Sequence, residues 1–167
     1  MTEVTLATAE DAAWLDAHQP SGGMPDVHRQ RLALQEAGDA AYLIGWRDGR
    51  RVGFVLVHFR HPRHHLSHLH FPDCAYVEGL EVETGARRLG VGRALMHEAE
   101  IRARPAADVG LSVGVDNAPA RALYRKLGYR PAAIPDYPVT WNYIDRVTGE
   151  IGEEGEVCSF WLKPLGL

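Results

Sequence analysis

The chain has 167 residues, of which 46% are hydrophobic and 24% are charged, and its formal net charge is −4. This is the composition of a soluble globular protein, and the length suits one domain, residues 1–167, with a core of its own. The acidic balance argues against a nucleic-acid-binding protein, and no apolar run approaches the ~20 residues of a membrane span.

The two cysteines, Cys74 and Cys158, lie far apart in the sequence and do not have the spacing of a metal site. No signal-peptide pattern precedes them. We therefore expect free thiols, a cytoplasmic location, and neither a nucleic acid nor a membrane as partner.

The first part of the chain is predicted to form a strand and two helices. Residues 2–6 alternate as a short strand does, and Thr8 has the chemistry of a helix N-cap. Turn-forming residues at 19–25 end the first helix. Pro25 suits the first position of a second helix, which we expect to end near Ala37.

Two apolar runs follow, at residues 41–46 and 52–59. They are separated by a short polar stretch that contains Asp48-Gly49. Because Asp-Gly between apolar runs is typical of a tight hairpin turn, the sequence predicts two antiparallel strands here.

The segment 61–73 is rich in histidine and contains two prolines. One interpretation is a zinc or nickel site, another is a solvent-exposed connection, and a third is that one histidine moves protons for a substrate. The segment has no nearby cysteine and no helical pattern that would fix paired ligands, so we expect no metal. The histidines are His61, His64, His65, His68 and His70.

The stretch 76–96 combines a strand, a glycine-containing turn and the start of a helix. Within the apolar run 76–82, Gly79 interrupts the alternation and indicates a bulge or a close approach of the backbone. The turn leads to Gly90 and Gly92 where the helix begins. Unpaired N–H groups and the helix dipole favour phosphate at such a point, although an ordinary tight turn has the same glycines.

Two familiar phosphate-binding motifs do not fit this turn. A Walker A loop requires a lysine, which is missing, and a dinucleotide fingerprint requires a third glycine where Leu95 stands. Arg87, Arg88 and Arg93 nevertheless supply charge that can pair with phosphate. We expect the helix to end at about Arg104, before a proline.

The last part of the chain is predicted to contain a strand, a helix and a hairpin. Residues 111–115 alternate as a strand, and Asn117 is placed to cap a helix that ends before Gly128. Two more strands are expected around 140–144 and 157–162. The acidic side chains near this hairpin either attract a cationic amine or form a solvated face; they are Asp136, Asp145, Glu150, Glu153, Glu154 and Glu156.

Two segments together resemble the GNAT superfamily of N-acetyltransferases. Arg87-x-x-Gly90-x-Gly92, placed after a strand that ends in Leu80-x-Val82, resembles the loop that holds the pyrophosphate of acyl-CoA in that family. The strand 111–115, followed by Asn117, a helix with Tyr124 and then Gly128-Tyr129, is similar to the second diagnostic segment. The two blocks cover about 55 residues.

The resemblance implies a mixed α/β fold of the GNAT type. We expect a central, strongly twisted sheet of about six or seven strands, flanked by about four helices. In the family, the strands equivalent to 76–82 and 111–115 run parallel and splay apart. The splayed backbone groups need partners elsewhere, and the amides of a pantetheine chain can supply them.

The resemblance also implies acetyl-CoA as co-substrate and a set of binding residues. The sequence departs from the family pattern at Arg88, where a glycine is common, and at Glu83-Thr84, where a proline is common; only the fine shape of the loop is affected. The expected cofactor-binding residues are Leu80, Glu81, Val82, Arg87, Arg88, Leu89, Gly90, Val91, Gly92, Arg93, Ala94, Asn117 and Ala120.

Acyl transfer to an amine requires a base, because an alkyl ammonium has a pKa of ~10.4. Glu78 matches the position where several family members carry a glutamate thought to act as the base. With regular pairing, it would share a face of the strand with Leu80 and Val82. Glu81 is the alternative, since a bulge at Gly79 could exchange the two. Either carboxylate could instead be a solvent-facing strand residue.

Three other residues acquire roles from the resemblance. Tyr124 would protonate the departing CoA sulfur, although a tyrosine here is also compatible with a core aromatic. The N–H of Val82 would polarise the thioester carbonyl as an oxyanion hole does. Asn117 would hold the pantetheine arm or simply cap its helix.

The leading hypothesis is an N-acetyltransferase that acts on a primary amine of a small molecule by direct attack in a ternary complex. An alternative is acetylation of a protein N-terminus or lysine. A catalytically silent acyl-CoA-binding module is a third possibility, and a metal-dependent hydrolase built on the histidine segment is a fourth. A homodimer is a common default for such a chain.

Overall fold

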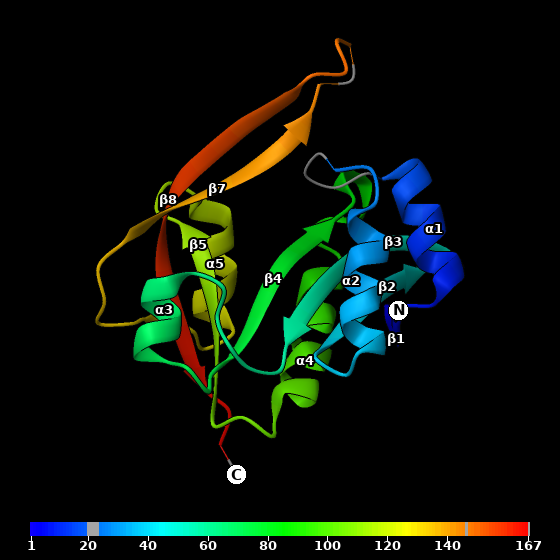
Figure 1. Cartoon of the computed structure of the whole chain (residues 1–167). Coiled ribbons are helices and arrows are strands. Elements are labelled where there is room, and N and C mark those ends of the chain that lie inside the picture. The colour runs from blue at the N-terminus through cyan, green and yellow to red at the C-terminus, as the bar shows by residue number, and fades with distance from the viewer. Residues whose placement is uncertain (20–23, 146, 167) are drawn as a thin grey trace.

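A computed structural model gives the structure of the protein and describes residues 1–19, 24–145 and 147–166 (Figure 1). Most of the turn predicted at 19–25 lies outside the described residues. The helices are α1 Ala9–His18, α2 Val27–Glu36, α3 His65–His70, α4 Val91–Ala103 and α5 Ala118–Lys126, with a 3₁₀ turn at Thr84–Ala86. The strands are β1 Glu3–Leu6, β2 Ala40–Arg47, β3 Arg50–His58, β4 Ala75–Val82, β5 Asp108–Gly114, β6 Arg130–Pro131, β7 Tyr137–Ile144 and β8 Ile151–Pro164.

The strands form one mixed sheet in the order β1-β2-β3-β4-β5-β8-β6, and β7 pairs with β8. Within the described residues, β4 and β5 run parallel, and the other neighbouring strands pair antiparallel. The predicted mixed α/β class is confirmed. The described sheet has eight strands rather than six or seven, because the two-residue β6 also pairs with β8.

Helices cover both faces of the sheet (Figure 1). On one face, α1 and α2 pack on an apolar cluster that contains Leu15, Leu32, Phe54 and Leu56. On the opposite face, α4 and α5 pack on a larger cluster that includes Leu95. These two sides are called the α1/α2 face and the α4/α5 face below.

Several elements begin where local side-chain chemistry predicts. Thr8 forms a complete capping box with Asp11, and the side chain of Asn117 accepts a hydrogen bond from the amide of Ala120. Asp48 and Gly49 have φ of 49° and 73°, as a tight hairpin turn requires. The second helix begins at Val27, two residues later than Pro25.

The histidine segment contains a helix that the sequence did not indicate. We expected residues 61–73 to form a connection without helical structure, but His65–His70 form α3. The ring of His64 accepts a hydrogen bond from the amide of Leu66 and so caps this helix. The segment lacks an apolar helical period, which is why the prediction was wrong.

The parallel pair splays as the family fold requires. The register joins Ala75 to Val109 and Val77 to Leu111, and the ladder ends there, although both strands continue. β4 runs on to Val82 and β5 to Gly114. A gap in the backbone pairing therefore opens between the C-terminal halves of β4 and β5.

A β-bulge at Gly79 changes the side on which the following residues lie. Glu78 pairs with Leu56 and Glu81 pairs with Phe54, so two residues of β4 oppose a single residue of β3. Gly79 has φ of 67°, which suits glycine. Because directly opposed residues share a face, Glu78 and Glu81 both lie on the α1/α2 face.

This register corrects the expectation for Glu78. We expected Glu78 to share a face with Leu80 and Val82, as in a regular strand. Leu80 and Val82 instead pack against the cluster on the α4/α5 face. The bulge accounts for the difference, because one extra residue reverses the alternation.

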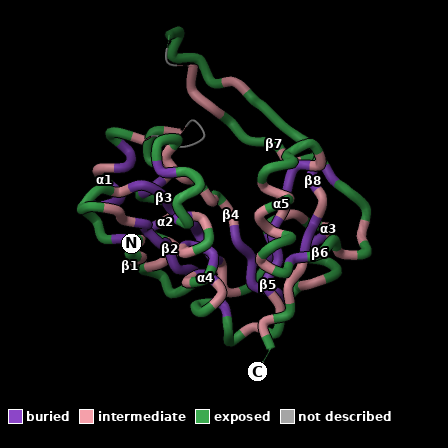
Figure 2. The backbone as a smooth tube through the Cα atoms, turned by 180° about the vertical axis from the view of Figure 1, so that it is seen from behind, coloured by how far each residue is buried: buried purple, intermediate pink, exposed green. Residues whose placement is uncertain are grey.

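β7 and the first half of β8 form a two-stranded ribbon that projects from the body (Figure 1). The ribbon is longer than the strands predicted at 140–144 and 157–162. Most of its residues are exposed, as the green tube in Figure 2 shows. In the ribbon, Trp141 lies opposite Glu154.

Candidate active site

The turn between β4 and α4 presents a row of backbone donors. Among the described residues, the N–H groups of residues 88–93 have no acceptor, and the first backbone bond of α4 runs from Ala94 to Gly90. No side chain caps this helix. The positive end of the helix dipole adds to these donors, so the turn has the properties of an anion-binding site.

The backbone of the turn is shaped by left-handed residues. Gly90 has φ of 83° and open space around the position of a Cβ, while Arg88 has φ of 63°. The left-handed conformation at Arg88 is one that glycine adopts without strain. A Cβ on Gly92 would meet Leu123 at 3.6 Å and Val82 at 3.8 Å.

These short distances bring three predicted regions together. The end of β4, the start of α4 and the middle of α5 meet around Gly92. Ala94 and Arg93 follow on α4, and Val91 is buried beneath them. Leu89 is exposed, and its carbonyl accepts a bond from Arg47 at 3.4 Å.

Arg87 binds the backbone of β4. Its Nε donates to the carbonyl of Val82 at 3.1 Å. The amide of Glu83 donates to Val52 on β3 at 2.8 Å. Because successive residues of a strand point their backbone groups to opposite edges, the N–H of Val82 points away from β3, toward the gap beside β5.

A hollow of about 530 Å³ continues from the turn along α4 and α5. Its charged lining residues are mostly basic, with Arg93, Lys126 and Lys163 beside one acidic residue, Glu100, which pairs with Lys163 at 2.8 Å. Such a lining suits a polyanionic ligand. The lining residues are Gly90, Arg93, Ala94, His97, Glu100, Lys126, Leu127 and Lys163.

Tyr124 lies half-buried on α5 and packs against the cluster on the α4/α5 face. Its ring contacts that of Tyr129 edge-on, with centroids 5.8 Å apart. Burial raises the pKa of its phenol to about 12. Within the described part of the chain, its hydroxyl has no hydrogen-bond partner, so it is available as a donor.

Glu78 is held by two cationic or potentially cationic side chains. His58 Nε2 lies 2.8 Å from its Oε1, and Arg63 Nη1 lies 3.1 Å from the same atom. Burial raises the pKa of the Glu78 carboxyl, but the hydrogen bond from His58 and the charge of Arg63 outweigh it, so the pKa lies below its ordinary value. Glu78 is therefore anionic at neutral pH.

Glu81 shares the α1/α2 face with Glu78 but lies beyond the bulge. It acts electrostatically on His28 and Tyr42, which form part of the packed layer under α2. The guanidinium of Arg31 lies against Gly79, where a Cβ would be 2.8 Å from its Nη2. The two carboxylates, on either side of the bulge, therefore have different neighbouring side chains.

His58 is a site residue that sequence reasoning missed. It ends the apolar strand β3 opposite Tyr76, and its ring stacks on the Tyr76 ring with centroids 6.0 Å apart. A single histidine at the end of an apolar strand forms no motif. Its relation to Glu78 depends on the pairing of β3 with β4, which the sequence does not specify.

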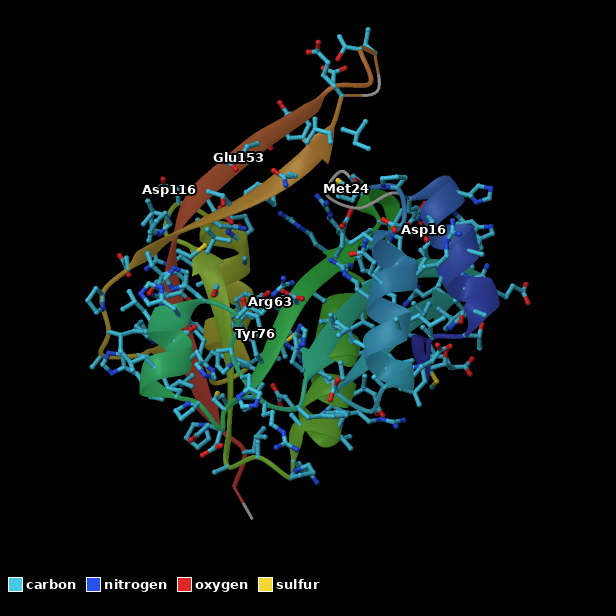
Figure 3. The ribbon with its side chains drawn as sticks, viewed as in Figure 1. Asp16, Met24, Arg63, Tyr76, Asp116 and Glu153 are labelled. Carbon is cyan, nitrogen blue, oxygen red and sulfur yellow. The ribbon has the colours of Figure 1, made fainter. Side chains whose placement is uncertain are left out.

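Below the gap, hydroxyl groups link β4, β5 and β7. Tyr76 donates to Ser112 at 3.2 Å, and Ser112 and Tyr137 are 2.6 Å apart. The ring of His64 stacks on Tyr137 with centroids 3.9 Å apart. Figure 3 labels Tyr76 and Arg63 in the middle of the molecule, and Glu153 on the ribbon.

The histidine segment does not assemble a metal site in the described residues, where no group of three or more His, Cys, Asp or Glu side chains could hold an ion. His61 and His68 contact each other, with ring centroids 5.2 Å apart. No helix in the described ranges is both long and apolar enough to cross a bilayer.

Comparisons with known proteins agree with this architecture. An N-alpha-acetyltransferase of Sulfurisphaera tokodaii is 32% identical over 101 residues, which are 58% of this chain and 60% of that relative. A ribosomal-protein-alanine N-acetyltransferase of Brucella melitensis has a TM-score of 0.68 at 19% identity, with 97% of this chain and 99% of that one covered. The yncA protein of Salmonella typhimurium, solved with its cofactor acetyl-CoA, has a TM-score of 0.66 at 16% identity, with 99% and 94% covered.

At these identities, the two structures show a shared fold. The family is shown by a family model, described as the acetyltransferase (GNAT) family, that matches residues 8–129. This range includes the splayed strands, the turn with unpaired amides and the helix that carries Tyr124. The chain therefore belongs to the GNAT acetyltransferase family.

Proposed function

We propose that the chain transfers the acetyl group of acetyl-CoA to a primary amine of a small molecule, by direct attack in a ternary complex. The observation that carries the proposal is the row of unpaired amides at residues 88–93, placed where splayed strands leave a gap. When bound, acetyl-CoA supplies an activated acetyl thioester. The residues of this chain bind acetyl-CoA, remove a proton from the acceptor amine and donate a proton to the departing sulfur.

The proposed cofactor contacts follow from the donors that the turn presents. The amides of residues 88–93 and the side chain of Arg93 hold the pyrophosphate, and the basic hollow accepts the rest of the nucleotide. The N–H of Val82 polarises the thioester carbonyl. The exposed edge of β4 from Leu80 to Val82 pairs with the pantetheine amides, and Glu81 contributes only its backbone. Asn117 and Ala120 border the arm at the start of α5, where Asn117 also caps the helix.

Two side chains manage the protons from opposite faces of β4. Glu78, on the α1/α2 face, supports removal of the proton from the acceptor ammonium, directly or through another group. Tyr124, on the α4/α5 face, donates to the departing sulfur. A positioned general acid or base contributes ~10²–10⁴ in rate.

Acetylation of a protein α-amine is a second candidate. Two similar proteins favour this candidate: the N-alpha-acetyltransferase of Sulfurisphaera tokodaii and the ribosomal-protein-alanine N-acetyltransferase of Brucella melitensis. A peptide substrate would need an open groove that leads to the thioester. The two candidates differ only in the acceptor, not in the cofactor site.

Binding of acetyl-CoA, measured by calorimetry, tests the shared part of the proposal. Gly90→Asp places a carboxylate among the unpaired amides, and we expect it to weaken binding by at least about tenfold through charge repulsion. Gly38→Asp is the matched control, because Gly38 also has φ of 82° and open space around it, but lies after α2. Equal affinities for the two variants and the wild type would contradict the assignment.

Acceptor preference is tested by following thiol release from acetyl-CoA with a panel of amines. The panel contains amino acids, polyamines, aminoglycosides and peptides with free N-termini. Turnover of a small amine supports the leading proposal, and turnover of peptides alone supports the second. Tight acetyl-CoA binding without release for any amine would indicate a catalytically silent acyl-CoA-binding module.

A further inference from the structure

The contact between Glu78 and His58 has the form of a carboxylate–imidazole pair. Nε2 of His58 lies 2.8 Å from Oε1 of Glu78, and the exposed fractions of the two side chains are 13% and 21%. Since an ionised carboxylate only accepts hydrogen bonds, Nε2 carries the hydrogen. The lone pair of a neutral ring is then on Nδ1.

Nδ1 has no hydrogen-bond partner in the described ranges. The ring itself is fixed on two sides, by the bond to Glu78 and by stacking on Tyr76. A half-buried ring whose tautomer is set by a carboxylate, and whose second nitrogen has no partner among the described residues, has the arrangement of a general base with its orienting group.

The charged and titratable groups around His58 favour this division of roles. Glu78 and Tyr76 face it from β4, and Arg63 approaches Glu78 from the segment before α3. With two partners, the Glu78 carboxyl has a pKa below its ordinary value, which makes it a weaker proton acceptor. A neutral imidazole is a stronger base than a carboxylate, so the ring is the better proton acceptor of the two.

The geometry points to His58, oriented by Glu78, as the group that receives the proton of the acceptor amine. This inference rests on the proposed function and refines the role of Glu78 within it. Glu78 becomes a positioning residue that fixes the ring and stabilises the imidazolium. The proton reaches Nδ1 directly or through one water.

The protons and bonds balance as follows. The acceptor ammonium gives one proton to His58; its nitrogen then bonds to the acetyl carbon, and the bond from that carbon to sulfur breaks. The sulfur takes a proton from Tyr124, which is restored by the second proton of the amine nitrogen. His58 releases its proton to solvent, so one proton is produced in each turnover.

Single substitutions separate this arrangement from one in which Glu78 is the direct base. His58→Gln keeps a donor for Glu78 but cannot titrate, and we expect kcat to fall by about 10²-fold, with KM for the amine within about twofold. The decrease of kcat/KM toward low pH, called the acid limb here, should disappear in this variant. Glu78→Gln should retain the limb but move it to lower pH, because the imidazolium loses its carboxylate.

The measurement uses the best amine of the panel, with kcat and kcat/KM determined between pH 5 and 9. His70→Gln, on exposed α3, is the matched control, and melting curves confirm that each variant folds. The double variant should be no slower than the worse single variant, because the two residues act as a unit. Independent effects that multiply would overturn the inference.

Two further outcomes decide between the proposals. If the wild type is active and His58→Gln keeps the acid limb with kcat within about threefold, the role of His58 is overturned and the proposed function stands. If the wild type acetylates no amine, both are overturned. A separate readout is the ring tautomer by ¹⁵N NMR: hydrogen on Nε2 supports the pair, and hydrogen on Nδ1 alone contradicts it.

Discussion

Glu78 and Glu81 lie on the same face of β4, although three positions separate them along the strand. Their opposite residues on β3, Leu56 and Phe54, are themselves two apart, and the bulge at Gly79 absorbs the extra residue of β4. The two candidate bases are therefore not exchanged by the bulge. They are brought to one side together, while Leu80 and Val82 face the other.

Gly79→Ala is expected to lower the free energy of unfolding by about 1–3 kcal/mol. The residue has φ of 67°, and an added Cβ would lie 2.8 Å from Nη2 of Arg31, so both backbone strain and a clash follow. Denaturant unfolding measures the effect. Gly85→Ala is the control, since nothing lies within 4 Å of its Cβ position and it should change stability little. Equal stabilities would show that the bulge tolerates a side chain.

Arg88→Gly is expected to be neutral or to stabilise the protein by up to about 1 kcal/mol. A left-handed residue other than glycine costs roughly 1–2 kcal/mol, which exceeds the greater chain entropy of glycine in the unfolded state. Arg87→Gly is the matched control, because Arg87 has φ of −68° and also binds the Val82 carbonyl. Thermal melting without cofactor should order the variants with Arg88→Gly above Arg87→Gly, and the reverse order would contradict the strain.

Tyr124→Phe is expected to reduce kcat by about 10²-fold while leaving stability within about 0.5 kcal/mol. Stability changes little because the hydroxyl has no partner to lose in the described part of the protein. With a pKa raised to about 12, the phenol stays protonated throughout the assay range. The activity of the wild type should therefore not fall below about pH 10 through ionisation of this residue. Thiol release and melting curves check both statements, and full activity of the variant would exclude Tyr124 as the acid.

The fold is expected to lose stability as the pH falls below about 6.5, in part through His28. His28 is fully buried and bonded to Tyr42 and to the carbonyl of Gln19, and burial lowers its pKa below 6.5. The unfolded chain then binds a proton that the folded chain does not, so the stabilising contribution is complete above 6.5 and declines toward the folded pKa. The contribution of His28 to the slope is at most about 1.4 kcal/mol per pH unit.

Unfolding in urea between pH 5 and 8 measures this dependence. His28→Gln, which can keep one of the two hydrogen bonds, should reduce the slope between pH 5 and 6.5. His18→Gln, at the exposed end of α1, should leave the slope unchanged. An identical slope in all three proteins would assign the pH dependence to other groups.

Local chemistry allowed the sequence to predict the elements around the splayed strands. The cap at Asn117, the hairpin at Asp48-Gly49 and the splayed pair of strands each depend on a few neighbouring residues or on the family resemblance. The turn at residues 87–93 was located in the same way, by its glycines. Such signals are contained within single segments.

Features that depend on pairing between distant segments could not be predicted from the sequence as well. Gly79 indicated a bulge, but the side taken by Glu78 depends on the register with β3. His58 became a candidate only when that register placed it beside Glu78. The helix α3 was not predicted because its sequence, His-Leu-Ser-His-Leu-His, has no apolar helical period.

β8 divides its pairing between two sets of partners. Residues 158–164 pair with β5 in the sheet, whereas residues 151–156 pair with β7 in the ribbon, and Cys158 pairs with both Gly114 and Tyr137. Insertions or deletions at the tip of the ribbon would thus leave the pairing of β5 with the rest of β8 intact. The length of the ribbon is therefore free to vary without altering the sheet of the body.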